Sequence, residues 1–324
     1  MTRRLHIAVM AGGPGSERAV SLRSGAGVAD ALRSLGHEVT RVDPQDREFT
    51  LPAATDVVFL ALHGAYGEDG TVQRQLETLG VPYTGCGVEV SRIAFDKVLT
   101  KRHCVAAGVP TPRFQVFDSP GAAWPEGWQP PAVLKPVCQG SSVGLHFING
   151  VEAWGAALED CLKHDARALL EERVTGRECT VGILAGQVLP IVEIRPQSGE
   201  YDYQSKYTVG ATDYICPAPW DTDLTAAAQA AALAAFNALG GGDYARVDMM
   251  IGKDGTPFVI EVNTLPGMTE TSLLPKAAAA AGLGYAALCD RMVQLALDRA
   301  VGSAGVDGRI GGGGKNSVNQ DHVV

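Results

Sequence analysis

Short apolar runs alternate with glycine turns and amphipathic stretches along the first ninety residues. Residues 5–11 and the segment DVVFLALHG at 56–64 are nearly continuous apolar runs, which are typical of buried strands. Between them, GGPGSER leads into a stretch with apolar residues at Val20, Val28 and Leu32, a helical spacing. Further expected elements are a strand at 37–44, a helix at 71–80 and a short strand at 81–85. Strands that alternate with helices predict a parallel sheet covered by helices.

The rest of the chain predicts two further segments and a tail. A helix at 95–108 ends at Gly108, because Pro110 cannot continue it. The later elements are expected in this order: two short strands around a glycine-serine loop within 124–148, a helix at about 151–164, the strand ALLEER at 168–173, two strands joined by Ala185-Gly186, a polar loop at about 197–216, an alanine-rich helix at 224–239, a hairpin at 246–263, and a last helix ending near Arg299. We therefore expect domains at 1–94, 95–186 and 187–301, and a disordered tail at 302–324.

The hairpin RVDMMIGKDGTPFVIEVN, residues 246–263, carries the most informative pattern. Its two arms are apolar and β-branched, and Asp254-Gly255 between them is a strong signal for a tight turn. If these two residues form the loop, Lys253 faces Thr256. Each further pair along the antiparallel ladder then lies one residue earlier on the first strand and one residue later on the second. This register predicts which polar side chains face one another.

In that register, four polar residues share one face of the hairpin, because side chains alternate with a period of two. Asp248 lies opposite Glu261, and Arg246 lies opposite Asn263. Two carboxylates and an amide oxygen are hard ligands that suit Mg²⁺, and the guanidinium is a fixed cation for a phosphate or an oxyanion. The alternative is a solvated face of an antiparallel sheet, which the pattern by itself leaves open.

Composition narrows the class of protein. A chain of 324 residues with 46% hydrophobic and 19% charged residues is typical of a soluble globular protein. The formal charge of −9, without a basic stripe, argues against nucleic-acid binding. The apolar runs are too short to cross a membrane, and the N-terminus predicts a strand rather than a secretion signal. Seven scattered cysteines without a C-x-x-C pair favour reduced thiols, so we expect a cytoplasmic protein without a disulfide framework or zinc site.

The segment GGPGSER at 12–18 allows two interpretations. It resembles the start of a dinucleotide fingerprint, and Asp43 ends the second strand, but Arg18 stands where the third glycine belongs. A helix N-terminus can also receive an anion, and Glu17 there could bind a substrate ammonium. The simpler interpretation of Glu17 is an acid that complements the helix dipole.

Other candidate site residues lie at strand ends and in loops. His63 ends a buried strand, where ligands of parallel sheets gather, although a single histidine is as often structural. Lys135 precedes the glycine-serine loop 139–144, whose N–H groups and hydroxyls could cover a phosphate chain, although a plain hairpin turn is the commoner outcome. The run YDYQSKY at 201–207 suggests a lid with tyrosine hydroxyls, or ordinary surface packing.

Together these segments resemble the D-alanine–D-alanine ligases of the ATP-grasp superfamily. The motifs that carry the resemblance are GGPGSERAVSLRSG, LHGAYGEDGTVQ, YTGCGVEVSRIAFDK, KPVCQGSSVG, YDYQSKY and RVDMM…IEVNTLPGMTETSLLP, in order from about residue 5 to 300. The resemblance implies an α/β (α+β) fold of three domains, the ATP-grasp architecture, in which an N-terminal parallel-sheet domain precedes two α+β domains that enclose ATP. Cys138 and Gln139 depart from the Arg-Glu pair expected in many members, which leaves the contacts of that loop open.

The resemblance also implies roles for the matching residues. ATP would be bound by Lys97, Lys135, Ser141, Glu171, Glu172, Val174, Glu178 and Lys206, with Glu171 at the adenine, Glu178 at the ribose and the lysines at the phosphates. Two Mg²⁺ ions, which Mn²⁺ can replace, would be held by Asp248, Glu261 and Asn263. The D-alanines would contact Glu17, His63, Ser272 and Leu273, and catalysis would involve Glu17, Ser141, Tyr207, Arg246 and Gly267.

The implied activity is ATP-dependent ligation of two D-alanines through a D-alanyl phosphate, which supplies peptidoglycan precursors for the cell wall. ATP and D-alanine are then the partners, with a homodimer expected by family analogy. Three alternatives are a D-alanine–D-lactate ligase, an NAD-dependent dehydrogenase and a non-catalytic nucleotide-binding regulator. The Lys206-Tyr207 loop favours the dipeptide ligase, the incomplete glycine fingerprint disfavours hydride transfer, and the full set of acids and lysines disfavours a regulator.

Overall fold

Strand β1 (His6–Met10) lies at the centre of a parallel sheet, between β2 (Glu38–Val42) and β3 (Val57–Leu60). The structure is a computed structural model that describes residues 3–197 and 210–307. Strands β1 and β3 are nearly continuous apolar runs because both faces of this sheet are covered. Helix α1 (Arg18–Ser34) packs closely on β1, and a Cβ added to Gly25 would lie 2.3 Å from the Cβ of Ala11.

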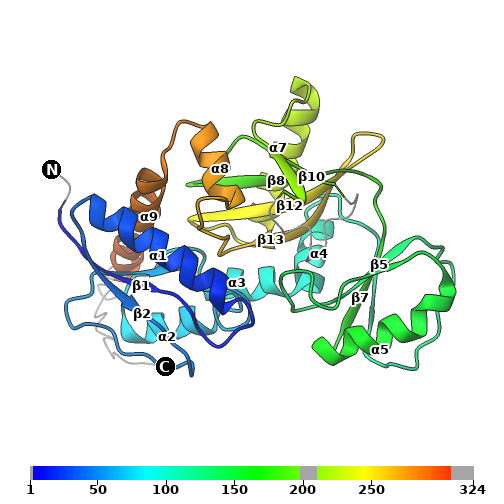
Figure 1. Cartoon of the computed structure of the whole chain (residues 1–324), viewed down its shortest axis with the longest axis horizontal. Helices are drawn as coiled ribbons and strands as arrows, with labels where there is room; N and C mark the ends of the chain where they lie inside the picture. The colour runs from blue at the N-terminus through cyan, green and yellow to red at the C-terminus, as the bar shows by residue number, and fades with distance from the viewer. Residues whose placement is uncertain (1–2, 198–209, 308–324) are drawn as a thin grey trace, which may run out of the picture.

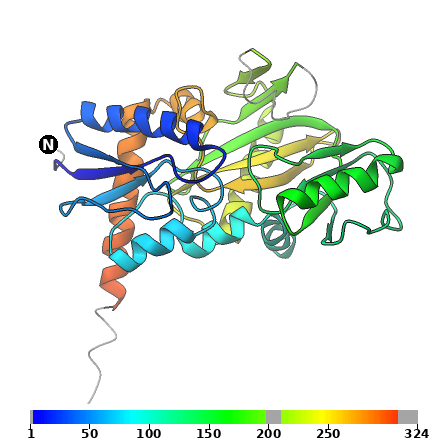
Figure 2. The same cartoon turned by 60° about the horizontal axis from the view of Figure 1, so that its bottom comes forward.

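The last helix, α9 (Tyr285–Asp307), returns to cover this first sheet. Val28 and Leu32 of α1 share one buried cluster with Leu288 and Met292 of α9. Figure 2 shows α9 in orange and red, running across the blue strands and α1. The two ends of the described chain therefore contribute to one hydrophobic core.

A second sheet is antiparallel and lies at the other end of the molecule (Figure 1). Its strand order is β4-β7-β5-β6, with bounds Phe114–Phe117, Ala168–Glu172, Ala132–Pro136 and His146–Ile148. Helix α5 (Trp154–His164) covers one face, after a single 3₁₀ turn at Val151–Ala153. Trp154 and Leu158 pack there against Leu134 and Leu170. The glycine-serine loop connects β5 and β6, as the sequence predicts.

The third sheet is antiparallel and holds the hairpin. Its order is β11-β10-β8-β12-β13, with β9 on β8, and the bounds are Thr212–Ile215, Val192–Pro196, Gly176–Leu184, Tyr244–Gly252, Pro257–Asn263 and, for β9, Gln187–Val188. Helix α7 (Thr222–Ala238), capped by Asp221, covers the face that carries Val181, Val247 and Met249. Because side chains alternate along a strand, Asp248 and its polar neighbours lie on the opposite face.

Four shorter helices connect these sheets. Their bounds are Thr71–Leu79 for α2, Val88–Phe95 for α3, Lys97–Ala106 for α4 and Leu273–Ala280 for α8. The Asp96 side chain caps α4 by accepting a hydrogen bond from Leu99 N at 3.0 Å. No helix in the ranges 3–197 and 210–307 is long and apolar enough to span a membrane.

The hairpin register at the site is as predicted, but the turn is not. Asp248 pairs with Glu261 and Arg246 with Asn263. At the turn, however, Gly252 N donates to Thr256 O, so the loop holds the three residues 253–255 and Gly255 has a positive φ of 86°. A bulge next to Asp248 shifts the register back by one residue. The extra turn residue and the bulge cancel, which is why the predicted pairs are correct.

The predicted fold class is confirmed, with one parallel and two antiparallel sheets. Four element predictions are wrong in detail. The strand expected at 81–85 is a single bridge between Val58 and Tyr83, residues 88–95 form a separate helix before α4, the loop expected at 197–216 contains β11, and the last helix continues to Asp307 instead of ending near Arg299. The part of the expected tail at 308–324 lies outside the described residues, and the domain limits stay predictions.

Candidate active site

The polar face of the third sheet forms one wall of a cleft of about 940 Å³. This volume lies within the range of small-molecule sites. The cleft is lined by residues of α1 and the loop after β3, of the glycine-serine loop and of the third sheet, so all three parts of the fold meet there. The predicted site residues that line it are Glu17, His63, Lys97, Lys135, Ser141, Glu178, Arg246, Asp248, Glu261, Asn263, Gly267, Ser272 and Leu273.

Five predicted site residues are not among those that line the cleft. Glu171 is buried beneath it, with 3% of its surface exposed. Glu172 is exposed at the end of β7, and Val174 is half-buried in the turn before β8. Lys206 and Tyr207 lie outside the described residues. The resemblance implied that Glu171, Glu172 and Val174 bind ATP, with Glu171 at the adenine, and these roles stay predictions.

Arg246 and Asp248 form a bidentate ion pair on the polar face. The Arg246 Nε and Nη2 atoms each donate to a different carboxylate oxygen of Asp248, both at 2.8 Å. The Thr180 hydroxyl on the neighbouring strand donates to the same carboxylate at 2.6 Å. Both charged side chains are more than four-fifths buried, so their orientation is well defined.

The Asn263 side chain indicates that this face holds a ligand. Its Oδ1 atom is buried and accepts no hydrogen bond within the part of the chain that the structure describes. Such an atom is costly unless something binds it. Within residues 3–197 and 210–307, no cluster of three or more His, Cys, Asp or Glu side chains is arranged to hold a metal. The candidate cation ligands are therefore two carboxylates, Asp248 and Glu261, and this amide oxygen, a set that fits Mg²⁺ with water and phosphate completing its shell.

A buried triad of charges lies beneath the cleft. Glu171 pairs with Lys101 through one carboxylate oxygen and with Lys135 Nζ through the other, at 2.6 Å for Lys135. Burial on its own raises the pKa of Glu171, but the two ammonium groups outweigh it and hold the pKa below its usual value. Lys101 also donates to Thr111 Oγ1 at 2.6 Å. The triad carries a net positive charge at the end of the cleft that Lys135 lines.

Lys97 adds a second buried ammonium at the same end of the cleft. Its Nζ atom lies 3.9 Å from Glu261 Oε2 and donates to Gln139 O at 2.6 Å. Burial lowers the pKa of Lys97, and the nearby Glu261 carboxylate partly opposes that shift. Lys97 and Lys135 therefore present positive charge to the part of the cleft where the acidic face begins.

Ser141 and Glu17 meet across the cleft. The Ser141 hydroxyl donates a hydrogen bond to Glu17 Oε1. The neighbouring Gly140 allows this approach, because a Cβ there would lie 2.9 Å from Glu17 Oε2. Ser141 and Ser142 both have positive φ angles, 51° and 59°, a strained conformation for side chains that carry a Cβ. The structure therefore brings these two predicted site residues together.

Asp43 is not presented to a dinucleotide. Both of its carboxylate oxygens accept from the Arg18 guanidinium, at 2.8 and 2.6 Å, and Oδ1 also accepts from Gly13 N at 3.0 Å. In a dinucleotide-binding site, the corresponding acid accepts a hydrogen bond from a ribose hydroxyl. Here Arg18 pairs with Asp43 instead. The arrangement instead shapes the turn that carries Glu17.

His63 belongs to a buried polar group that the sequence indicated only in part. Its Nδ1 atom lies 3.8 Å from Glu68 Oε1, and its Nε2 atom lies 3.4 Å from Ser24 Oγ. Ser24 in turn accepts from Met268 N at 3.2 Å, next to Gly267. Burial raises the pKa of Glu68, which also lines the cleft. Glu68 lies in LHGAYGEDG but was not singled out there, since one acid in a loop is a weak signal.

Lys101 is a second residue that the sequence did not single out. It is completely buried and pairs with Glu171. The spacing of Lys97 and Lys101 places both on one side of α4, one turn apart, and that spacing was the available signal. Lysines at this spacing usually lie on a solvated face, so only packing shows that this pair is buried.

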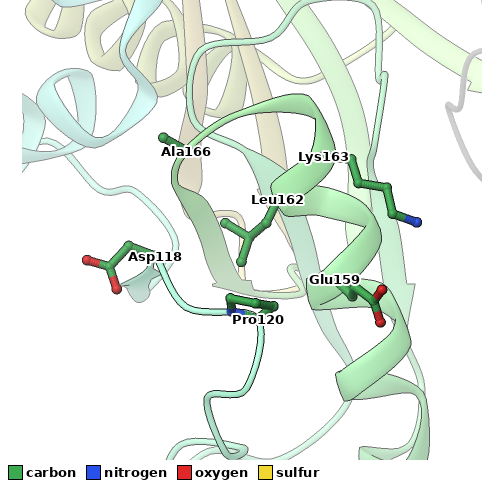
Figure 3. Close-up of a pocket in the computed structure, with 6 residues that line it drawn as sticks. All are labelled: Asp118, Pro120, Glu159, Leu162, Lys163 and Ala166. Carbon is green, nitrogen blue, oxygen red and sulfur yellow. The ribbon is translucent and has the colours of Figure 1, made fainter.

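A second pocket lies beside α5 and has no comparable group of converging polar side chains. Figure 3 shows it beside α5, with Leu162 next to Pro120. Glu159 and Lys163 project to one side of the helix and Asp118 points the other way. Its charged groups do not converge, so the functional residues concentrate in the larger cleft.

Comparisons with known proteins agree with this geometry. A family model described as "D-ala D-ala ligase C-terminus" matches residues 106–294, and one described as "D-ala D-ala ligase N-terminus" matches residues 42–86. A D-alanine–D-alanine ligase of Methylacidiphilum infernorum is 46% identical over 290 residues, which cover 90% of this chain and 95% of the relative. One from Aquifex aeolicus is 45% identical, over 87% of this chain and 97% of the relative.

Solved structures give the same result. The crystal structure of a D-alanine–D-alanine ligase from Bacillus anthracis has a TM-score of 0.82 and 35% identity, covering 92% of this chain and 99% of that chain. A second structure of a Bacillus anthracis D-alanine–D-alanine ligase, complexed with ATP, has a TM-score of 0.79 and 32% identity over the same shares of both chains.

Proposed function

Because this chain belongs to the D-alanine–D-alanine ligase family, we propose that it uses ATP to join two D-alanine molecules into D-alanyl-D-alanine, a precursor of peptidoglycan. The observation that carries the proposal is that the hydrogen-bonded pair Glu17 and Ser141 lines the same cleft as the acidic pair Asp248 and Glu261. One end of this cleft suits an amino acid, and the other end suits a nucleotide phosphate.

Activation of the first D-alanine comes first, because a carboxylate is a poor electrophile. Its oxygen attacks the γ-phosphorus of ATP, the bond to the β-phosphate oxygen breaks, and ADP leaves with that electron pair. We propose that Glu17 binds the ammonium of this D-alanine and that Ser141 orients Glu17. Lys97 and Lys135, with Lys206, would offset the charge of the phosphates.

The second step forms the peptide bond. The amine of the second D-alanine attacks the carbonyl carbon of the acyl phosphate, phosphate leaves, and the nitrogen loses its extra proton. Arg246 and the Gly267 N–H would stabilise the tetrahedral oxyanion, and one such donor contributes about 3 to 4 kcal/mol. Ser272 and Leu273 start α8, so its N-terminal end can receive the carboxylate of the second D-alanine. Tyr207 and His63 complete the proposed set.

Divalent ions fit the acidic face. Asp248, Glu261 and the unsatisfied Asn263 Oδ1 would hold two Mg²⁺ or Mn²⁺ ions. When bound, such ions neutralise the transferring phosphoryl group. The bidentate pair between Arg246 and Asp248 fixes both groups on this face. Glu171, Glu172, Val174 and Glu178 would contact the adenine and ribose.

The test is a substrate screen with purified protein, Mg²⁺ and ATP. ADP release should require D-alanine, should not occur with L-alanine, and should equal the amount of dipeptide formed. Product analysis with D-alanine and D-lactate together separates the dipeptide ligase from a depsipeptide ligase. ADP release that ignores D-alanine, or a product other than D-alanyl-D-alanine at neutral pH, would overturn the proposal.

A further inference from the structure

The start of the glycine-serine loop is fixed to helix α4. We call residues 137–139 the loop base. The Lys97 backbone N–H donates to Val137 O at 3.3 Å, and its Nζ donates to Gln139 O at 2.6 Å. Lys97 therefore holds the loop base through both its main chain and its side chain.

A second segment holds the loop base from the other side. His164, the last residue of α5, and residues 165–167, which connect α5 to β7, form the segment that we call the anchor turn. Asp165 Oδ2 accepts from Cys138 N at 2.5 Å, and Val137 N donates to Arg167 O at 3.1 Å. Gln139 Nε2 donates to His164 O at 2.8 Å. Each of the three residues in the loop base thus has a partner in the anchor turn.

An ion pair joins the anchor turn back to α4. The Arg167 Nη2 atom donates to Asp96 Oδ2 at 2.6 Å, while Asp96 Oδ1 caps α4. Asp165 Oδ1 accepts from Arg167 N at 3.1 Å, which shapes the turn that presents Arg167. Asp96 directly precedes Lys97, so α4, the loop base and the anchor turn form a closed ring of contacts, of which Lys97 and Gln139 line the cleft.

A contribution to the stability of the protein does not by itself explain the ion pair between Arg167 and Asp96. The Arg167 side chain is 41% exposed, and exposed ion pairs contribute only about 0 to 1 kcal/mol. The pair does, however, link the two segments that determine where Lys97 and the strained Ser141 and Ser142 lie. Small displacements of such groups are costly for catalysis, because a shift of about 1 Å can lower a rate on the order of 100-fold.

We propose that Asp96, Asp165 and Arg167 are positioning residues that hold Lys97 and the glycine-serine loop in register with the phosphates of ATP. None of the three lines the cleft. The proposal rests on the proposed function for the identity of the nucleotide. According to this proposal, contacts outside the cleft determine how accurately Lys97 and the glycine-serine loop are placed against the phosphates of ATP.

Two substitutions test the ring of contacts without removing a residue that is proposed to bind ATP. Asp96→Asn keeps the oxygen that caps α4 but removes the charge, and Arg167→Met removes the guanidinium but keeps much of the apolar stem. Each should raise KM for ATP on the order of tenfold and leave KM for D-alanine near the wild-type value. Arg167→Lys should restore part of the loss. Lys163→Met, an exposed cation on α5, is the matched control and should resemble wild type.

A double-mutant cycle decides between positioning and independent effects. If Asp96 and Arg167 act as one unit, the double variant should lose little more than the worse single variant. The proposal would be overturned if the increases in KM for ATP of the two single variants multiplied in the double variant. It would also be overturned if the variants had an unchanged KM for ATP and a lower Tm. Direct binding of a non-hydrolysable ATP analogue separates this proposal from the proposed function. Weaker analogue binding in both variants supports the ring even if wild type fails to release ADP with D-alanine.

Discussion

The Ser141 hydroxyl donates a hydrogen bond to Glu17 Oε1, although 124 positions separate the two residues along the chain. Ser141 lies in the loop between β5 and β6, and Glu17 lies at the N-terminal end of α1. The bond therefore joins α1 to the glycine-serine loop of the second sheet across the cleft. Gly140 leaves room for this approach, because a Cβ there would lie 2.9 Å from Glu17 Oε2.

Removal of this bond should weaken the site for the first D-alanine. Ser141→Ala leaves Glu17 without the hydroxyl donor, and a hydrogen bond to a charged group contributes about 1.5 to 3 kcal/mol. We expect kcat/KM for D-alanine to fall about 10- to 100-fold in steady-state assays of ADP release. Ser34→Ala, at the far end of α1, is the control. An equal loss in both variants would show that the effect is not specific to the link with Glu17.

Glu261→Gln should weaken the metal site. The substitution keeps the shape of the side chain but removes a negative charge from the proposed ligands of the divalent ions. We expect turnover to fall on the order of 100-fold and half-maximal activity to require more Mg²⁺. Binding of Mn²⁺, measured by electron paramagnetic resonance, reports on the site without turnover. Unchanged Mn²⁺ affinity would remove Glu261 from the ligands, and Glu159→Gln, exposed on α5, controls for the loss of charge.

Lys101→Met should lower the stability of the protein. The substitution leaves Glu171 buried with only the Lys135 ion pair, and breaking a buried ion pair costs about 3 to 5 kcal/mol. The free energy of unfolding in urea measures this loss. Lys163→Met removes an exposed ammonium and should change stability by less than about 0.5 kcal/mol. A loss at Lys101 as small as that at Lys163 would mean that the triad does not support the fold.

Asp243 should make stability depend on pH. Its carboxylate accepts from Arg299 Nη1 at 2.7 Å, but burial raises its pKa to about 6 from the ordinary value of 3.8. Between these values the folded protein holds a proton that the unfolded chain releases, so this site's contribution to stability falls as pH rises.

The measurement is urea unfolding of wild type and Asp243→Asn between pH 4.5 and 7. The variant lacks the titrating group, so the stability of wild type relative to the variant should fall by about 2 kcal/mol over this interval. Asp30→Asn, on an exposed carboxylate of α1, should show no such trend. A difference between wild type and Asp243→Asn that stays constant with pH would contradict the assignment.

Local patterns predicted much of the fold and of the candidate site. The apolar runs around β1 and β3 and the helical spacing in α1 match elements of the structure. The pairing of Asp248 with Glu261 was also predicted, because hairpin partners lie close together in sequence. The prediction of a two-residue turn was wrong, since turn type and bulges depend on how the strands twist against their neighbours.

Sequence by itself determined which residue types stand at fixed local spacings: the alternating face of the hairpin and the small residues of the glycine-serine loop. Only the tertiary structure decided that Lys101 is buried against Glu171, that Arg167 reaches Asp96, and that α9 covers the first sheet. The physical reason is range. Backbone periodicity and caps act over a few residues, whereas burial and ion pairing depend on segments that packing brings together from distant parts of the chain.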